Sequence, residues 1–155
     1  MLEIFVDGDA CPVKPEVLRV AERHGLTVYL VSNRGMRSAG HPLIRNVLVD
    51  ESSDAADDWI ADHIGTGDIA VTADIPLASR CLKAGASVLG PTGRPFTEAN
   101  IGGALASRDL MARLRESGDV RGGGPAFSKQ DRSRFLTALE STVQAVRRAR
   151  ITSPV

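Results

Sequence analysis

The chain has 155 residues, of which 43% are hydrophobic and 25% charged, and its formal net charge at neutral pH is zero. This composition excludes disordered, collagen-like and coiled-coil proteins and is typical of a globular protein with a buried core. The only cysteines, Cys11 and Cys81, exclude a disulfide framework and a cysteine-based zinc site. The acidic N-terminus does not resemble a signal peptide, and no apolar stretch is long enough to span a bilayer. We therefore expect a cytoplasmic protein without membrane contact.

Charge is distributed unevenly along the chain. Residues 1–100 contain 9 Lys and Arg against 14 Asp and Glu, whereas residues 101–155 contain 10 against 5. An acidic body beside a basic segment is the distribution expected of a protein that handles a polyanion next to an acidic site. Surface helices also carry solvated arginines, so charge alone does not decide between these two interpretations.

Short apolar runs alternate with helical patterns over residues 1–90. Strands are predicted at 2–6, 27–31, 46–49, 69–72 and 87–90, and helices at 17–24, about 54–64 and 77–85. Continuous apolar strands separated by helices are typical of a parallel sheet covered by helices on both faces. We therefore predict an α/β three-layer sandwich with a mostly parallel sheet.

The pattern changes after residue 90. A loop is predicted over 91–100, a helix over about 101–116 and a glycine-rich connection over 121–127. The chain shows no internal repeat and no second core. We expect residues 1–155 to form one domain, with 91–155 as a loop and helical extension of the α/β core.

The last predicted helix begins at Ser128, which is spaced from Asp131 as in a capping box, and ends at about Ala149. Its apolar residues form one stripe, so this helix packs on another surface. The members of the stripe are Phe135, Leu136, Leu139, Val143 and Val146. The sequence leaves open whether that surface is the core of the same chain or a dimer interface, and it does not specify the oligomeric state.

Acidic side chains stand at the ends of predicted strands and at the start of a helix. Asp7 and Asp9 follow the first strand, Asp74 follows the strand at 69–72, and Asp54 opens a helix. Ligands bind to open parallel sheets outside the carboxyl ends of the strands, near the point where the strand order reverses. Clustered carboxylates repel one another unless a cation neutralises them, and oxygen ligands without His or Cys suit Mg²⁺ or Mn²⁺. The sequence therefore predicts a metal site of the kind that activates water for attack on a phosphodiester.

Each acid also has a structural interpretation. Asp9 and Asp54 stand just before helices, where an aspartate commonly accepts a hydrogen bond as the N-cap. Asp57 and Asp58 lie opposite the apolar positions of their helix, as residues of a solvated face do. Asp74 directly follows an apolar parallel strand, where ligand sites are built, so the structural interpretation is weakest for it.

The other reactive side chains indicate no site of their own. Cys11 lies between a strand and a helix, a place that can acidify a thiol, but no second cysteine or suitably spaced arginine accompanies it. A buried turn residue is the favoured interpretation of Cys11, and Cys81 is expected in the core. The histidines lack metal-ligand spacing, and His24 is interpreted as a partner of the helix dipole.

Several motifs together resemble the YaiI/YqxD family of bacterial proteins. They are Asp-Gly-Asp-Ala-Cys-Pro-Val-Lys at 7–14, Asp-Ala-Ala-Asp at 54–57, Gly-Asp-Ile-Ala-Val-Thr-Ala-Asp-Ile-Pro-Leu-Ala at 67–78, Arg-Asp-Leu-Met at 108–111, and Gly-Gly-Pro at 123–125 followed by Ser128, Asp131, Arg132 and Phe135. The resemblance covers nearly the whole chain. By fold, the family is similar to PIN-like nuclease domains, whose acidic residues hold a divalent metal for RNA cleavage. The resemblance thus implies a PIN-like fold and a nuclease activity.

Applied residue by residue, the resemblance implies that Asp7, Asp9, Asp54, Asp57 and Asp74 are the catalytic acids. Asp7, Asp54 and Asp74 are then the core ligands of Mg²⁺ or Mn²⁺, with the other two beside them. Asp58 is not part of the family pattern.

We therefore expect a metal-dependent phosphodiesterase that acts on RNA. Basic and polar residues near loops and in the C-terminal part are candidates to hold the phosphates. These candidate substrate-binding residues are Lys14, Asn33, Arg37, Arg45, Arg108, Arg115 and Arg132.

Two alternatives from other classes remain. The first is a haloacid-dehalogenase-type phosphatase, in which Asp7 is the nucleophile and Ser32-Asn33 resembles the second motif of that fold. Against it, Cys11 stands where that fold has Thr or Val, and the Gly67-Asp68 pair precedes its strand instead of following it. The second is a module that binds metal or RNA without turnover, because clustered acids indicate a metal and not a reaction.

Overall fold

The computed structural model describes residues 2–8, 13–32, 41–50, 55–97, 101 and 128–152. The predicted glycine-rich connection at 121–127 and the predicted helix at about 101–116, beyond Ile101, lie outside the described residues. No helix in the described ranges is long and apolar enough to cross a membrane.

Six strands form one sheet in the order β3-β2-β1-β4-β5-β6. The strands are β1 (Ile4–Asp7), β2 (Val28–Ser32), β3 (Ile44–Leu48), β4 (Ile69–Val71), β5 (Ser87–Leu89) and β6 (Pro95–Phe96). Strands β1 to β5 are parallel, and β6 pairs antiparallel with β5. The five predicted strands are confirmed, with ends that differ by one or two residues.

Strand β6 corrects the prediction of a plain loop over 91–100. A turn in which Gly90 N donates to Arg94 O at 2.9 Å returns the chain along β5. Gly93 adopts a left-handed φ of 86° in this turn, a conformation that glycine takes without steric strain. The strand has two residues, too few to produce an alternating pattern in the sequence.

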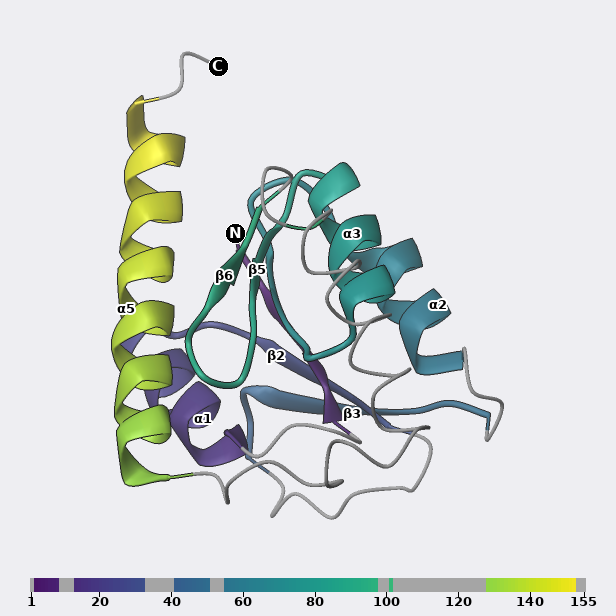
Figure 1. The fold of residues 1–155 in the computed structure, drawn as a ribbon, viewed down its shortest axis with the longest axis horizontal. Coiled ribbons are helices and arrows are strands. Elements are labelled where there is room, and N and C mark those ends of the chain that lie inside the picture. The colour runs from purple at the N-terminus through teal and green to yellow at the C-terminus, as the bar shows by residue number, and fades with distance from the viewer. Residues whose placement is uncertain are drawn as a thin grey trace, which may run out of the picture.

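Helices cover both faces of the sheet, as Figure 1 shows: α1 and α5 lie on one side, and α2 and α3 on the other. Their bounds are α1 (Lys14–His24), α2 (Ala55–His63), α3 (Ile75–Lys83) and α5 (Lys129–Thr152). The predicted α/β architecture with a mostly parallel sheet and a C-terminal helix is therefore confirmed.

The ends of α1 and α5 follow from local sequence signals. Gly25 ends α1 in the left-handed conformation, at φ 66°. At the start of α5, Ser128 Oγ accepts a hydrogen bond from Asp131 N, and Asp131 Oδ2 accepts one from Ser128 N, both at 3.0 Å. This reciprocal pair is the capping box that the sequence predicts.

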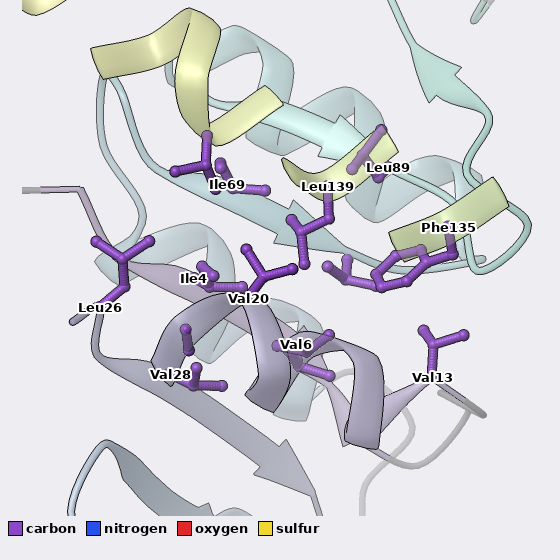
Figure 2. Close-up of a cluster of buried hydrophobic side chains, with 14 of the residues drawn as sticks. Ile4, Val6, Val13, Val20, Leu26, Val28, Ile69, Leu89, Phe135 and Leu139 are labelled. Carbon is purple, nitrogen blue, oxygen red and sulfur yellow. The ribbon is translucent and has the colours of Figure 1, made fainter. Parts of the chain in front are cut away.

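The apolar stripe of α5 packs on the core of the same chain. Phe135, Leu139 and Val143 are fully buried against α1 and the sheet, and Leu136 and Val146 pack at the margin of this cluster. Figure 2 shows Phe135 and Leu139 reaching down toward residues of β1, β5 and α1. Burying each large side chain of this kind stabilises the fold by about 1.5–3 kcal/mol, so α5 is an integral layer of the structure.

The opposite face of the sheet is closed by α2 and α3. Phe5, Tyr29 and Trp59 form a cluster of rings, with 4.9 Å between the centroids of Phe5 and Tyr29. Cys81 is completely buried in the same layer, and burial raises the pKa of its thiol to about 12. The predicted core position of Cys81 is confirmed, and its thiol is not a nucleophile at neutral pH.

Strand β1 lies at the point where the strand order reverses. The chain passes from β1 to β2 and β3 on one side and then crosses to β4 and β5 on the other. The carboxyl ends of β1 and β4 are therefore neighbours, with Val6 opposite Val71. This is the position where open parallel sheets bind their ligands.

Candidate functional site

Two of the predicted acids, Asp7 and Asp74, lie near the carboxyl ends of β1 and β4, where one hydroxyl group contacts the carboxylate of Asp7 and the backbone N–H of Asp74. Asp7 is the last residue of β1, and Thr72 directly follows β4. Thr72 Oγ1 donates a hydrogen bond to Asp7 Oδ2 at 3.3 Å and accepts one from Asp74 N at 3.0 Å. The result is a hydrogen-bonded chain, Asp7–Thr72–Asp74, that spans the two strand ends.

Asp74 also begins α3. Its Oδ1 accepts a hydrogen bond from Leu77 N at 3.0 Å, so the side chain is the N-cap of this helix. Within the described residues, its second carboxylate oxygen has no partner. The N-terminus of α3 favours negative charge through the helix dipole. The N-cap bond thus fixes the position of the Asp74 carboxylate at the carboxyl edge of the sheet. The sequence does not predict this cap, because it depends on the exact start of the helix.

Asp57, a third predicted acid, lies half-buried in the first turn of α2. Its neighbour Asp58 accepts a hydrogen bond from Arg80 on α3 at 2.8 Å, and this bond raises the pKa of the Arg80 guanidinium. Asp58 therefore joins two surface helices, in agreement with its absence from the family pattern. Asp9 and Asp54 lie outside the described residues.

The structure separates the candidate substrate-binding residues. Lys14 begins α1, at the same edge of the sheet as Asp7. Arg45 is exposed on the outer strand β3, opposite Tyr29 and not at the carboxyl ends. The guanidinium of Arg132 donates to Glu16 at 2.8 Å and joins α5 to α1. The remaining candidates lie outside the described residues: Asn33, Arg37, Arg108 and Arg115.

The donor set at the carboxyl edge suits a hard cation. Asp7 and Asp74 supply carboxylate oxygens and Thr72 a hydroxyl, and Mg²⁺ is commonly held by one or two carboxylates with water filling the other positions. In the described part of the chain, no three His, Cys, Asp or Glu side chains are close enough together to hold a metal ion. The third predicted ligand, Asp54, is outside that part. The oxygen donors of Asp7, Thr72 and Asp74 are of the type that Mg²⁺ or Mn²⁺ prefers, and they include no His or Cys, the usual ligands of zinc.

Thr72 and Ser32 are polar residues at strand ends that the metal-site prediction does not include. Thr72 is 3% exposed and ends the apolar run of β4, and Ser32 is 3% exposed at the carboxyl end of β2. A hydroxyl residue at the end of an apolar parallel strand is the sequence signal that could have identified both. The structure shows the role of the Thr72 hydroxyl, which donates a hydrogen bond to Asp7 and orients its carboxylate.

Asp68 is an acid beside the same two strands, β1 and β4, but at the amino edge of the sheet. Its Oδ1 accepts a hydrogen bond from Glu3 N at 3.0 Å, and its Oδ2 accepts one from Gly65 N at 2.9 Å. Both oxygens are thus used to join the starts of β1 and β4. Asp68 has a structural role at the amino edge of the sheet.

The fold and the site define an α/β protein with acidic side chains at the strand-order reversal of a parallel sheet, the place where such proteins bind ligands. The chain belongs to the YaiI/YqxD family: the family model described as "Uncharacterized BCR, YaiI/YqxD family" matches residues 5–145. The match includes Asp7, Thr72 and Asp74, and the resemblance drawn from the sequence motifs is confirmed.

Several bacterial proteins are similar to this chain over most of their length. A UPF0178 protein of Parvibaculum lavamentivorans is 64% identical over 148 residues, which cover 96% of this chain and 97% of the relative. A UPF0178 protein of Rhodopseudomonas palustris is 56% identical over 151 residues, covering 97% and 92%. One of Rhodospirillum rubrum is 57% identical over 150 residues, covering 96% and 100%. No solved structure shows a significant match to the chain.

Proposed function

We propose that the chain is a divalent-metal-dependent phosphodiesterase that cleaves RNA. The observation that supports this most is the hydrogen-bonded chain Asp7–Thr72–Asp74 at the carboxyl ends of β1 and β4. The carboxylates of Asp7, oriented by the Thr72 hydroxyl, and of Asp74, fixed as the N-cap of α3, supply oxygen ligands of the kind that a hard cation prefers. A site for a cation at the strand-order reversal of an open sheet is in turn suited to an anionic substrate.

In this proposal Asp7, Asp74 and Asp54 hold Mg²⁺ or Mn²⁺, and Asp9 and Asp57 lie beside them. When bound, such an ion lowers the pKa of water and neutralises charge that develops on a phosphodiester. The chain's own residues prepare the site before any ion binds. The hydroxyl of Thr72 fixes the orientation of Asp7, and the N-cap bond to Leu77 fixes Asp74.

RNA is proposed as the substrate because of the basic C-terminal part of the chain and the similarity of the family to PIN-like nuclease domains. Lys14 stands at the N-terminus of α1, and helix N-termini at this edge favour phosphate groups. Contacts of this type give affinity for the backbone of a nucleic acid without base specificity. We accordingly expect cleavage that depends little on sequence.

The test is cleavage of end-labelled single-stranded RNA with Mn²⁺ and with chelator. Asp7→Asn removes one carboxylate charge from the site, and Asp58→Asn removes one from the surface pair with Arg80. We expect metal-dependent cleavage that falls at least about 100-fold in Asp7→Asn, and no change in Asp58→Asn. Equal cleavage by wild type and Asp7→Asn, or no cleavage by the wild type, would contradict the proposal. Tight RNA binding without cleavage, unaffected by Asp74→Asn, would favour a binding module.

One observation favours the phosphatase alternative with Asp7 as nucleophile. Ser32 is buried at the carboxyl end of β2, one residue beyond Val31, which pairs with Asp7 of β1. This alternative predicts an aspartyl-phosphate on Asp7, which beryllofluoride would mimic. Beryllofluoride binding that disappears in Asp7→Asn and weakens in Ser32→Ala would support it. The absence of such binding would leave the nuclease as the better account.

A further inference from the structure

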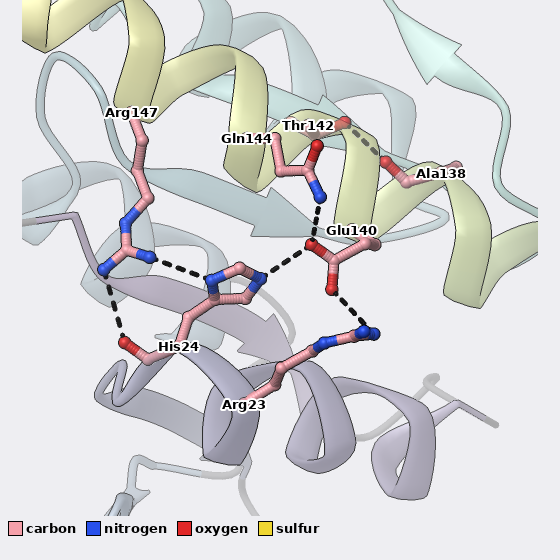
Figure 3. Close-up of polar contacts among 7 residues, drawn as sticks. All are labelled: Arg23, His24, Ala138, Glu140, Thr142, Gln144 and Arg147. Atoms are coloured by element: carbon pink, nitrogen blue, oxygen red, sulfur yellow. Dashed lines mark hydrogen bonds and ion pairs between the residues drawn. The ribbon is translucent and has the colours of Figure 1, made fainter.

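Helices α1 and α5 run in the same direction and are joined at both ends by polar contacts. Near their N-termini, Arg132 pairs with Glu16 at 2.8 Å. Near the C-terminus of α1, His24 lies between Glu140 and Arg147 of α5, as Figure 3 shows. The apolar residues between these ends are Phe135, Leu139 and Val143, all fully buried. Beyond Val143, α5 is attached by the contacts of Arg147 with His24 and by Val146, which packs at the margin of the core.

The geometry around His24 specifies its protonation state. Its Nδ1 is 2.9 Å from Arg147 Nη1, and its Nε2 is 2.7 Å from Glu140 Oε2. A guanidinium only donates hydrogen bonds and a carboxylate only accepts them. Nδ1 must therefore be the acceptor and Nε2 must carry the proton. The neutral imidazole with hydrogen on Nε2 is the single form of His24 that satisfies both neighbours.

The charged groups around His24 come from both helices. On α5, Glu140 also accepts from Gln144 at 2.9 Å, and Arg147 Nη2 donates to the carbonyl of His24 at 3.4 Å. On α1, Arg23 Nη1 is 3.3 Å from Glu140 Oε1. Burial raises the pKa of Glu140, but hydrogen bonds from Gln144 and His24 outweigh burial, so the pKa is lowered overall and the group stays ionised.

Other charged groups lie on the same two helices. Glu22 of α1 pairs with His41 at 3.4 Å and lines a pocket together with Arg19, Arg23 and Glu140. Arg19 and Arg148 are exposed on α1 and α5. Among the described residues, Arg147 is thus the cation that contacts the ring of His24 directly.

We propose that His24 is a pH-sensitive latch: its protonation releases Arg147, and with it the last turns of α5, from α1. A protonated ring places an N–H on Nδ1 opposite the N–H of Arg147 and brings two positive charges to the same contact. The bond from Nε2 to Glu140 is retained, because a cation donates to a carboxylate more strongly. Release therefore begins after Val143 and leaves the buried residues of α5 in place. A histidine ordinarily changes charge between about pH 5 and pH 8, within the range that cells experience.

The first test is the tautomer of His24, read from its imidazole ¹⁵N chemical shifts at about pH 8. The latch requires hydrogen on Nε2 and an unprotonated Nδ1. A tautomer with hydrogen on Nδ1 would overturn the proposal, because Arg147 would then have no acceptor on the ring.

The second test is hydrogen exchange of the amides of α5, expressed as protection factors to remove the intrinsic effect of pH. On going from about pH 8 to about pH 5, protection over residues 144–152 should fall about tenfold, the change expected from losing one hydrogen bond to a charged group, while protection over 132–139 stays constant. An equal fall along the whole helix, or no fall, would overturn the latch.

Two substitutions of His24 test the contacts of its two ring nitrogens one at a time. His24→Asn places a carbonyl near the position of Nδ1 that accepts from Arg147 at every pH, so protection over 144–152 should become independent of pH. His24→Gln keeps a donor for Glu140 but removes the acceptor for Arg147, so protection should be low at both pH values. His41→Asn is the matched control and should behave like the wild type. A pH-dependent fall that persists in His24→Asn would overturn the proposal.

Discussion

The two edges of the parallel sheet both carry aspartates beside β1 and β4, but the contacts of these aspartates differ. At the amino edge, Asp68 accepts hydrogen bonds from two backbone N–H groups, one on each of its oxygens. At the carboxyl edge, Asp74 uses one oxygen as a helix cap, and Asp7 is oriented by the hydroxyl of Thr72. An acid next to an apolar strand is therefore structural at one edge and suited to binding a cation at the other.

The physical reason is the direction of the chain at each edge. At the amino edge the chain enters the strands through loops whose backbone N–H groups need acceptors, and Asp68 supplies them for Glu3 and Gly65. At the carboxyl edge the chain leaves the strands for helices, whose N-termini together favour negative charge. The carboxyl edge thus brings the carboxylates of Asp7 and Asp74 to the place where strands end and helices begin.

Substituting one glycine at each edge is expected to give the largest difference in the free energy of unfolding. A Cβ on Gly93, in the turn between β5 and β6, would lie 2.7 Å from Arg134 O of α5, whereas a Cβ on Gly25 would meet nothing within 4 Å. Both have positive φ, so both substitutions strain the backbone. We expect Gly93→Ala to lower the free energy of unfolding by about 3 kcal/mol or more, and Gly25→Ala by about 1 kcal/mol.

Chemical denaturation of the two variants measures this difference. Equal losses would show that the close approach of this turn to Arg134 of α5 does not contribute to stability.

Substituting Asp68 at the amino edge and Asp74 at the carboxyl edge is expected to give the next largest difference in the free energy of unfolding. Asp68→Ala removes the acceptor of two backbone N–H groups and should lower the free energy of unfolding by about 3 kcal/mol. Asp74→Ala removes one N-cap bond and should cost about 1 kcal/mol. Thermal unfolding of both variants checks the order. A larger loss for Asp74→Ala would mean that the carboxyl edge, and not the amino edge, depends on its acid for stability.

The smallest effect concerns pH and the start of α5. A backbone and a side-chain hydrogen bond with Ser128 lower the pKa of Asp131 below its ordinary value of 3.8. A carboxyl group whose pKa is depressed in the folded state contributes stability above pH 3.8, and this contribution is lost as the pH falls through the lower folded value. Asp131→Asn should therefore flatten the decline of the melting temperature in this acidic range. An unchanged pH profile would show that the capping box does not contribute to stability.

Much of the fold could be predicted from the sequence because the signals are local. The apolar runs of β1 to β5, Gly25 at the end of α1 and the capping box at Ser128 depend on residues close together in the chain. Strand β6 could not be predicted, because its two residues have no periodicity and pair only after the turn brings them to β5.

The site could be predicted less completely, because it depends on distant residues. The place of Asp7 and Asp74 follows from strand ends, but the role of Thr72 requires the adjacent register of β1 and β4. Arg132 has the charge of a phosphate-binding residue, yet its partner Glu16 lies 116 positions away. A partner at that distance along the chain leaves no signal in the local sequence.

The most direct measurement of the central claim is Mn²⁺ binding, followed through the electron paramagnetic resonance signal of the free ion. We expect saturable binding by the wild type that weakens at least about tenfold in Asp7→Asn and in Asp74→Asn. Asp58→Asn and Asp68→Asn, which change a surface acid and the acid of the amino edge, should bind Mn²⁺ like the wild type. No saturable binding, or equal weakening in all four variants, would contradict the assignment of the cation site to the carboxyl edge.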